Sequence, residues 1–279
     1  MKLARKYSFD TYGAGRSTIV TLKNSFHGRT METLTATGQD ELHQYFDPFP
    51  PGFRYAAAND LDALKAAIDE TVCAVMMEPV QGEGGVQPLD ADFVHKASEL
   101  CREKDILLIF DEVQTGVGRT GKLYAWEHFG VRPDILTSAK GLGGGLPVGA
   151  CLCVERLGAV MGPGTHGSTF GGNPIVCAGV CEVLSRMEEP LFQQVRQRGA
   201  FLRDTLSKCD EIVEIRGMGL MLGLVLQTKQ AKAVAARCVE RGLLVLTAKT
   251  LVRLLPPLTI SQEELEQGIA ILKEVLTEK

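Results

Sequence analysis

The chain has 279 residues, of which 45% are hydrophobic and 23% charged, and its formal net charge is -4. This composition is ordinary for a globular protein, and the length favours two domains. Acidic and basic residues are interspersed along the chain, so the sequence lacks the basic tract that nucleic acid or an anionic membrane would require. No apolar run is long enough for a membrane span, and the basic start Met1–Lys6 has no signal-peptide core behind it. We therefore expect a small-molecule enzyme.

Five short apolar runs alternate with amphipathic stretches in the first part of the chain. These runs are Ser17–Thr21, Cys73–Met77, Ile106–Phe110, Ile135–Thr137 and Val148–Val154. Their near-continuous apolarity predicts strands buried on both faces of a sheet. Between the second and third, Asp90 is placed to cap a helix whose apolar positions have helical spacing. Those positions are Phe93, Val94, Ala97, Leu100 and Cys101. The alternation predicts an α/β fold with a mostly parallel sheet.

Two other segments are predicted to lie outside this pattern. Phe46–Tyr55 (FDPFPPGFRY) is expected to be a surface excursion, because its prolines cannot donate to a sheet ladder. Met1–Tyr7 resembles the end of a helix already under way, since it has apolar positions but no capping residue, and so short a helix is marginal alone. We expect that an upstream segment is missing.

The second part of the chain predicts a smaller α/β unit. Helices are expected at about Pro174–Met187, Pro190–Cys209, Gln230–Arg241 and Gln262–Thr277, and strands at Ile212–Arg216, Met221–Val225, Leu243–Leu246 and Val252–Leu255. We place the boundary in the long helix near Met187, which gives a large domain over 1–187 and a small one over 188–279.

The eight cysteines predict buried, reduced thiols and no metal site. They are at positions 73, 101, 151, 153, 177, 181, 209 and 238, nearly all inside apolar segments. None forms a Cys-x-x-Cys pair and no histidine lies at ligand spacing from one, which argues against zinc. Reduced thiols predict a cytoplasmic location.

Chemistry-bearing residues stand in four glycine-rich segments. Asp111 and Glu112 end an apolar strand, where acids of an open α/β sheet meet ligands. Lys140 follows another strand between small residues, as a Schiff-base lysine requires, since a bulky cofactor must approach its nitrogen. The other segments are 164–174, rich in hydroxyl and backbone N–H groups, and 78–85, with two carboxylates. Taken singly, a solvated turn, a surface lysine and a capped loop are open alternatives.

The order of these segments resembles one family. The matching motifs are NSFHGRT at 24–30, EPVQGEGG at 78–85, FDEVQTGVGRTG at 110–121, TSAKGLGGG at 137–145, HGSTFGGNP at 166–174, RGMGLMLG at 216–223 and VRLLPPL at 252–258. They are similar to the class III, pyridoxal-phosphate-dependent aminotransferases of fold type I, of the acetylornithine/ornithine type. A Rossmann dehydrogenase does not fit, because the glycines at 141–145 lack the G-x-G-x-x-G spacing.

The resemblance implies that pyridoxal 5'-phosphate (PLP) is the cofactor. It assigns Lys140 as the catalytic lysine, which holds PLP as an internal aldimine and then moves a proton. Asp111 matches the acid that pairs with the pyridine nitrogen, beside Glu112 at the cofactor.

Further cofactor contacts follow from the same motifs. Phe26 matches the aromatic side chain that stacks on one face of the ring, Val113 packs on the other, and Gln114 bonds the 3′ oxygen. Thr169 matches a residue that reaches the phosphate of the neighbouring subunit's cofactor, so the resemblance implies a homodimer.

Four residues are implied in substrate binding. Arg253 matches the arginine that binds the α-carboxylate of glutamate or 2-oxoglutarate. Glu83 matches a switch residue that pairs with this arginine when an ω-amine is bound. Arg29 and Ser168 are expected near the far carboxylate of the amino donor.

The implied reaction is a transfer of the ω-amino group of N-acetylornithine to 2-oxoglutarate, giving N-acetylglutamate semialdehyde and glutamate, in arginine biosynthesis. Ornithine, succinylornithine and 4-aminobutyrate are alternative donors. Family members carry an upstream phosphate-binding turn that is missing here, so a non-catalytic truncated fragment is a further alternative.

Overall fold

The structure, a computed structural model, describes residues 1–278, which form two compact units. The first comprises Met1–Pro79, Leu89–Gln114 and Trp126–Leu184, and the second comprises Val80–Pro88, Thr115–Ala125 and residues 185–278. The second unit thus takes two short stretches from within the first part of the chain. The domains 1–187 and 188–279 stay a prediction.

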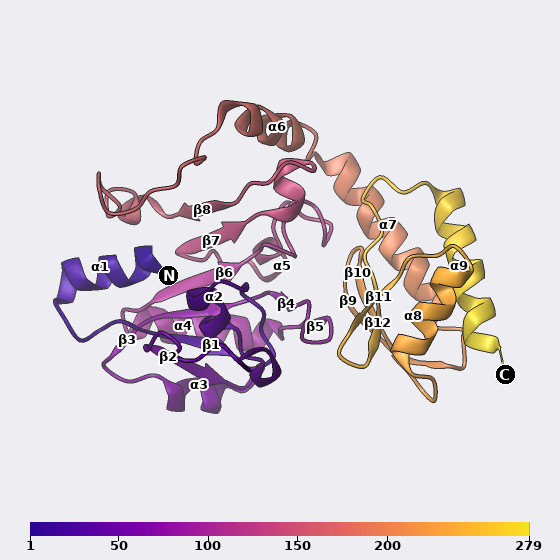
Figure 1. The fold of residues 1–279 in the computed structure, drawn as a ribbon, viewed down its shortest axis with the longest axis horizontal. Helices are drawn as coiled ribbons and strands as arrows, with labels where there is room; N and C mark the ends of the chain where they lie inside the picture. The colour runs from indigo at the N-terminus through magenta and orange to yellow at the C-terminus, as the bar shows by residue number, and fades with distance from the viewer. Residues whose placement is uncertain (279) are drawn as a thin grey trace. The chain divides into compact units, whose positions relative to one another are not determined.

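A six-stranded sheet forms the centre of the first unit in the described part of the chain. Its spatial order is β2 (Phe53–Ala56), β1 (Thr18–Leu22), β3 (Val72–Met77), β6 (Leu107–Asp111), β7 (Ile135–Ser138) and β8 (Ala150–Cys153) (Figure 1). Each neighbouring pair is parallel except β7 and β8, which are antiparallel. The predicted α/β fold with a mostly parallel sheet is confirmed.

Helices cover this sheet because its strands are apolar on both faces. On one face, Leu3 and Ala4 of α1 (Lys2–Tyr12) join a buried cluster with Leu107 and Ile109 of β6. The predicted helix after Asp90 is α4 (Ala91–Glu103), which lies against β6 and buries all five apolar residues assigned to it. Burial of each large apolar side chain is worth about 1.5–3 kcal/mol, so these faces fix the helices to the sheet.

The remaining elements of the first unit are short, apart from one helix. They are α2 (Met31–Ala36), η1 (Asp40–Leu42), α3 (Leu61–Ala67), α5 (Trp126–Phe129), η2 (Lys140–Gly143), η3 (Glu155–Leu157) and α6 (Pro174–Ser185). Although α6 is apolar, it has no buried residue among those that the structure describes. Across residues 1–278, no helix is both long and apolar enough to cross a membrane.

Three sequence predictions about the first unit are wrong. The strand at Val148–Val154 is shorter, pairs antiparallel at the sheet edge as β8, and is largely exposed instead of buried. Part of the predicted surface excursion, Phe53–Tyr55, lies in strand β2, because the prolines stop before it and leave its amide groups free to pair with β1. Four cysteines are exposed, those of β8 and α6, at 151, 153, 177 and 181.

The second unit is an antiparallel sheet backed by helices. Its four described strands run in the order β11 (Leu246–Ala248), β12 (Leu251–Leu254), β10 (Met221–Leu226) and β9 (Ile212–Met218). Apolar residues of this sheet share one core with α7 (Glu189–Leu206), α8 (Ala231–Glu240) and α9 (Gln262–Thr277) (Figure 1). The strand predicted at Leu243–Leu246 starts three residues later, because the segment before it follows α8 as irregular backbone. The hairpin of β4 (Val80–Gln81) and β5 (Gln87–Pro88) also belongs here.

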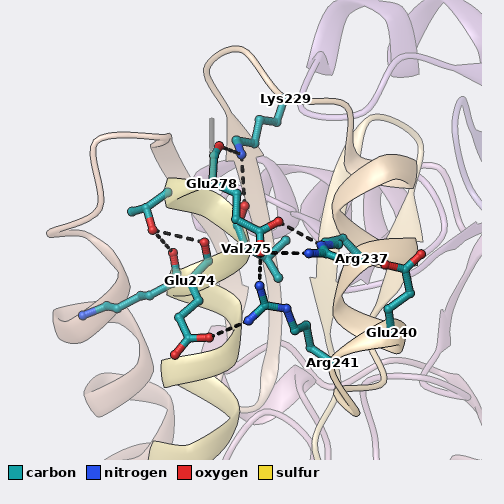
Figure 2. A network of polar contacts seen from close by, with 9 residues as sticks. Lys229, Arg237, Glu240, Arg241, Glu274, Val275 and Glu278 are labelled. Carbon is teal, nitrogen blue, oxygen red and sulfur yellow. Dashed lines mark hydrogen bonds and ion pairs between the residues drawn. The ribbon is translucent and has the colours of Figure 1, made fainter.

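Polar contacts fix both ends of α9. At its start, Ser261 and Glu264 form a reciprocal capping box. At its end, Lys229 Nζ donates to the carbonyl of Val275 at 3.0 Å, and Arg241 Nη1 pairs with Glu274 at 2.9 Å (Figure 2). Arg237 and Arg241 also pair with Glu278 (Figure 2). Cations at a helix C-terminus satisfy its last carbonyls and its dipole, so they hold α9 against α8.

Candidate active site

Predicted site residues and polar neighbours gather at the carboxyl ends of four adjacent parallel strands of the first unit. Phe26 and His27 follow β1, Glu78 follows β3, Asp111 ends β6, and Lys140 follows β7. Parallel neighbours place these ends at the same edge of the sheet, where ligands of open α/β sheets bind. The β6–β7 register pairs Asp111 with Thr137, three residues before Lys140.

Asp111 is a buried carboxylate held by three donors. It is 5% exposed, and its Oδ1 accepts from the Thr137 hydroxyl at 2.9 Å and the Val113 N–H at 3.2 Å. Its Oδ2 lies 2.7 Å from Nδ1 of His27. Burial alone raises the pKa of Asp111, but the bond and charge of His27, with these other donors, bring it below its ordinary value. Asp111 is therefore ionised at neutral pH.

His27 contacts Asp111 from a fully buried position. A carboxylate only accepts, so Nδ1 of His27 must carry the hydrogen. The backbone N–H of His27 donates to the Thr37 hydroxyl at 2.9 Å, which fixes the residue at a second point. Burial lowers the pKa of His27, but Asp111 and the charge of Glu78 raise it above its ordinary value. His27 lies in the motif NSFHGRT, and its place beside Phe26 was the one signal in the sequence.

Phe26 is positioned through its backbone and its ring. Its N–H donates to Oε2 of Glu78 at 2.8 Å, and Glu78 is 3% exposed. The guanidinium carbon of Arg29 lies 5.6 Å from the centre of the Phe26 ring, within the range of a cation–π contact. Two residues assigned separately from the sequence, Phe26 and Arg29, are thus brought together.

Lys140 begins η2 with an unusual backbone. Its φ is 48°, in the left-handed region, and the residue is exposed. Such a conformation costs about 1–3 kcal/mol for a residue with a side chain, and it is commonly retained at functional sites. Its neighbours Ala139 and Gly141 are small, as the sequence indicated.

The other cofactor residues predicted in this unit occupy varied positions. Glu112 is fully buried and its Oε1 accepts from the N–H of Trp126 at 2.8 Å, so it supports the start of α5. Val113 and Gln114 follow it, partly exposed. Ser168 and Thr169 are exposed in the loop before α6. Their roles at the cofactor and the substrate stay predictions.

The loop at 164–173 ends in a helix cap. Oδ1 of Asn173 accepts from the N–H of Ile175 at 3.0 Å and of Val176 at 3.3 Å. These are donors that the first turn of α6 would leave unpaired. The cap leaves the hydroxyls of Ser168 and Thr169 on the exposed part of the loop.

The second unit contains the predicted pair of Arg253 and Glu83. Nη1 of Arg253 lies 2.7 Å from Oε1 of Glu83. The Arg253 side chain, on β12, is 7% exposed, whereas that of Glu83, between β4 and β5, is 36% exposed. A buried arginine is therefore neutralised by a carboxylate that reaches solvent.

Close packing holds the hairpin that carries Glu83. Val86 is fully buried with a left-handed φ of 50°. A Cβ on Gly223 would lie 2.9 Å from Cβ of Val86, and one on Gly217 would lie 2.9 Å from its Cγ1. Only glycine at these two positions of β9 and β10 lets Val86 approach, so the hairpin is fixed on the sheet.

The donor set of the first unit fits PLP. An accessible primary amine, Lys140, suits a carbonyl group; an ionised buried carboxylate, Asp111, suits a protonated pyridine nitrogen; and an aromatic ring, Phe26, suits a flat heterocycle. The four strand ends supply all three groups.

Comparisons with known proteins agree with this chemistry. Residues 1–276 match the family Aminotransferase class-III. The chain is 49% identical to the acetylornithine aminotransferase of Haemophilus ducreyi over 280 residues, which are 100% of this chain and 71% of that protein. It is 51% identical to the succinylornithine transaminase of Salmonella paratyphi A, covering 96% of this chain and 68% of the relative.

Among solved structures, the ornithine aminotransferase of Toxoplasma gondii ME49 superposes with a TM-score of 0.92 at 36% identity. The match covers 99% of this chain and 68% of that one. The fold type and the family inferred from the motifs are thereby confirmed. The chain belongs to the class-III aminotransferases, which are PLP-dependent transaminases.

Proposed function

We propose that the protein transfers the ω-amino group of N-acetylornithine to 2-oxoglutarate, as a step of arginine biosynthesis. The observation that carries the reaction type, an ω-amine donor with 2-oxoglutarate as acceptor, is the pair of Arg253 and Glu83, joined at 2.7 Å in the second unit. An amine donor without a carboxylate at its reacting end needs a neutralised arginine, whereas 2-oxoglutarate needs a free one. The names of the relatives, an acetylornithine aminotransferase and a succinylornithine transaminase, support a donor of this type.

The chemical step depends on Lys140 and Asp111. PLP, when bound, supplies an electron sink for the pair left on the substrate carbon after deprotonation. Lys140 Nζ would take up that proton from the substrate carbon and release it again, which requires a basic amine beside the reacting atoms. Asp111, ionised and fixed by three donors, keeps the pyridine nitrogen protonated.

Arg253 and Glu83 select between the two substrates. The planar guanidinium of Arg253 binds the α-carboxylate of 2-oxoglutarate through two parallel hydrogen bonds. Glu83 leaves at that moment, because its half-exposed side chain can turn into water at little cost. With an ω-amine bound, the carboxylate of Glu83 pairs with Arg253 again, so the buried guanidinium is not left without an anionic partner.

Arg29 binds the far carboxylate of the donor, with Ser168 near it. Arg29 is exposed, and its guanidinium lies over the ring of Phe26, which is the proposed stacking face for the cofactor. A donor carboxylate can therefore reach this guanidinium from solvent.

Half-reactions with single donors test the substrate. The PLP-loaded protein is mixed with N-acetylornithine, ornithine, succinylornithine or 4-aminobutyrate, and the loss of the cofactor absorbance is followed by stopped flow. We expect the largest kcat/KM for N-acetylornithine, and 2-oxoglutarate then restores the spectrum. A clear preference for another donor would reassign the substrate, and no reaction with any of them would mean that residues 1–279 do not catalyse transamination by themselves.

The protein is also proposed to act as a homodimer. Phe170 is 80% and Ile175 is 74% exposed, in and beside the loop that contains Thr169, and α6 shows an apolar surface. Large exposed apolar side chains that gather on one segment typically mark a protein interface. A second copy on this surface would bring Thr169 to the neighbouring cofactor.

We place the protein in the cytoplasm. All eight cysteines are free within residues 1–278, including the exposed pairs on β8 and α6. Exposed free thiols persist in a reducing compartment. Fractionation of the source cells with an antibody to the protein tests this location, and recovery in a secreted or envelope fraction would contradict it.

A further inference from the structure

We propose that His27 is a positioning residue for the transamination site: it donates a charge-assisted hydrogen bond from Nδ1 to Oδ2 of Asp111. This bond fixes both the direction and the negative charge of the carboxylate that meets the pyridine nitrogen. The inference rests on the proposed role of Asp111, but it concerns a residue to which neither the motifs nor the comparisons give a function.

Geometry is the first support. Nδ1 of His27 and Oδ2 of Asp111 are 2.7 Å apart, and the side chains are 0% and 6% exposed. The distance is that of an N–H···O bond to an ionised acceptor, which is about twice as strong as a neutral one. Oδ1 of the same carboxylate is held by Thr137 and Val113, so the two oxygens have different partners. Without His27, Oδ2 of Asp111 would lose the donor that fixes its direction.

The backbone around His27 shows why its ring is directed at Asp111. Its N–H is bound by Oγ1 of Thr37, which itself donates to the carbonyl of Thr33 at 3.0 Å. The preceding N–H, that of Phe26, is bound by Glu78. Two consecutive amide groups are thus bound by residues that directly follow β3 and α2, which holds the segment after β1 in place.

Charge is the second support. A buried carboxylate without a cationic or donor partner would take up a proton, and a neutral Asp111 would no longer hold a proton on the pyridine ring. Burial opposes a protonated imidazole at His27, but the hydrogen bond and charge of Asp111 and the charge of Glu78 outweigh it and raise the pKa. The ring therefore supplies positive character on the side of Asp111 that faces away from Thr137.

A matched pair of variants tests the proposal. In His27→Asn the amide nitrogen falls near the place of Nδ1, whereas in His27→Gln it falls near that of Nε2, so only the first can restore the bond to Asp111. The readouts are the Kd for PLP, the absorbance maximum of the bound cofactor, and kcat and KM. We expect His27→Gln to weaken PLP binding and lower kcat by about tenfold or more, and His27→Asn to recover most of both.

Equal effects of the two variants, large or small, would overturn the proposal, because a role in packing alone does not depend on where the donor stands. Circular dichroism and Tm verify that both variants are folded.

A second measurement needs no cofactor. Long-range 1H–15N NMR of His27 in the cofactor-free wild type should show Nδ1 protonated, and Asp111→Asn should change this signal. A wild type that binds no PLP would refute the proposed function and leave this NMR result to decide on His27. An NMR spectrum with Nδ1 unprotonated would overturn the inference even in an active enzyme.

Discussion

Two side chains and one backbone N–H, from separate elements, determine the state of Asp111. Thr137 comes from the neighbouring strand, Val113 from the turn after β6, and His27 from the segment after β1. On a surface acid, each of these contacts would change the pKa little. Asp111 is only 5% exposed, so here the contacts act in a medium that screens charges weakly. The reactive carboxylate is thus prepared before any ligand arrives.

Stability should depend on pH through the pair of His27 and Asp111. The pKa of His27 is raised in the folded protein. Its contribution to the free energy of unfolding is therefore complete below about pH 6.5, the pKa in the unfolded chain, and is lost as the pH rises through the pKa of the folded protein. The lowered pKa of Asp111 gives a contribution that is present above about pH 4 and is lost on acidification.

We therefore expect the difference in unfolding free energy between wild type and His27→Asn to shrink as the pH rises from 6 to 9. Urea unfolding at a series of pH values measures it. A difference that is constant or grows over this range would show that His27 is not charged in the folded protein.

Replacement of Glu83 should separate the two substrates. In Glu83→Gln the charge of Arg253 is no longer neutralised, so a substrate carboxylate binds without displacing an anion. The KM for 2-oxoglutarate should fall several-fold, and that for the ω-amine should rise. Steady-state kinetics with each substrate varied measures both constants.

Glu214→Gln is the control, because it removes an exposed carboxylate that pairs with Arg216 at 2.7 Å on β9 of the same unit. Unchanged KM values in Glu83→Gln, or the same changes in the control, would rule out the switch.

At the scale of elements, burial explains which sequence predictions succeeded. The strands β3 and β6 were found because all their residues are buried, so their apolarity reports their position directly. β8 is also apolar, but most of its residues are exposed. The sequence of a strand does not show whether other elements of the chain pack on it. Short elements such as β4 and β5 depend on tertiary packing and carry no periodic signal.

The candidate site also contains residues that the sequence predicted and supporting contacts that it did not. The motifs assigned roles to Asp111, Lys140 and the pair of Glu83 and Arg253, since each is a charged residue in a distinctive sequence context. They did not identify Glu78 as the acceptor for Phe26, or Thr37 as the support of His27. Those contacts join residues far apart in sequence, and single-sequence patterns do not report such pairs.

Packing around Gly217 provides a prediction for the β9–β10 hairpin. Its φ is +103°, and a Cβ there would lie 1.9 Å from the carbonyl oxygen of Met221 as well as against Val86. Gly217→Ala should therefore lower the free energy of unfolding well beyond the cost of the backbone conformation alone.

Gly242→Ala measures that backbone cost separately, because Gly242 has a φ of +83° and no atom within 4 Å of the new Cβ. We expect about 1–2 kcal/mol for the control and a clearly larger loss for Gly217→Ala, by urea unfolding. Equal losses would mean that the hairpin relaxes around the added methyl group.

At the scale of the whole molecule, the apolar surface near α6 provides a test of assembly. Ile175→Glu places a charge on the proposed interface and should shift the protein from dimer to monomer in sedimentation velocity. Val239→Glu is the control, since Val239 is an exposed apolar residue too, at 51%, but lies on α8 of the second unit. A wild type that sediments as a monomer, or a dimer unaffected by Ile175→Glu, would refute this interface.

The central claim is that Lys140 carries the cofactor of a transaminase. The most direct measurement is to incubate the purified chain with PLP, reduce it with borohydride, and locate the label by peptide mapping. The account predicts an absorbance band in the visible range before reduction and a single label on Lys140, absent from Lys140→Ala. A missing band, or a label scattered over surface lysines, would contradict it.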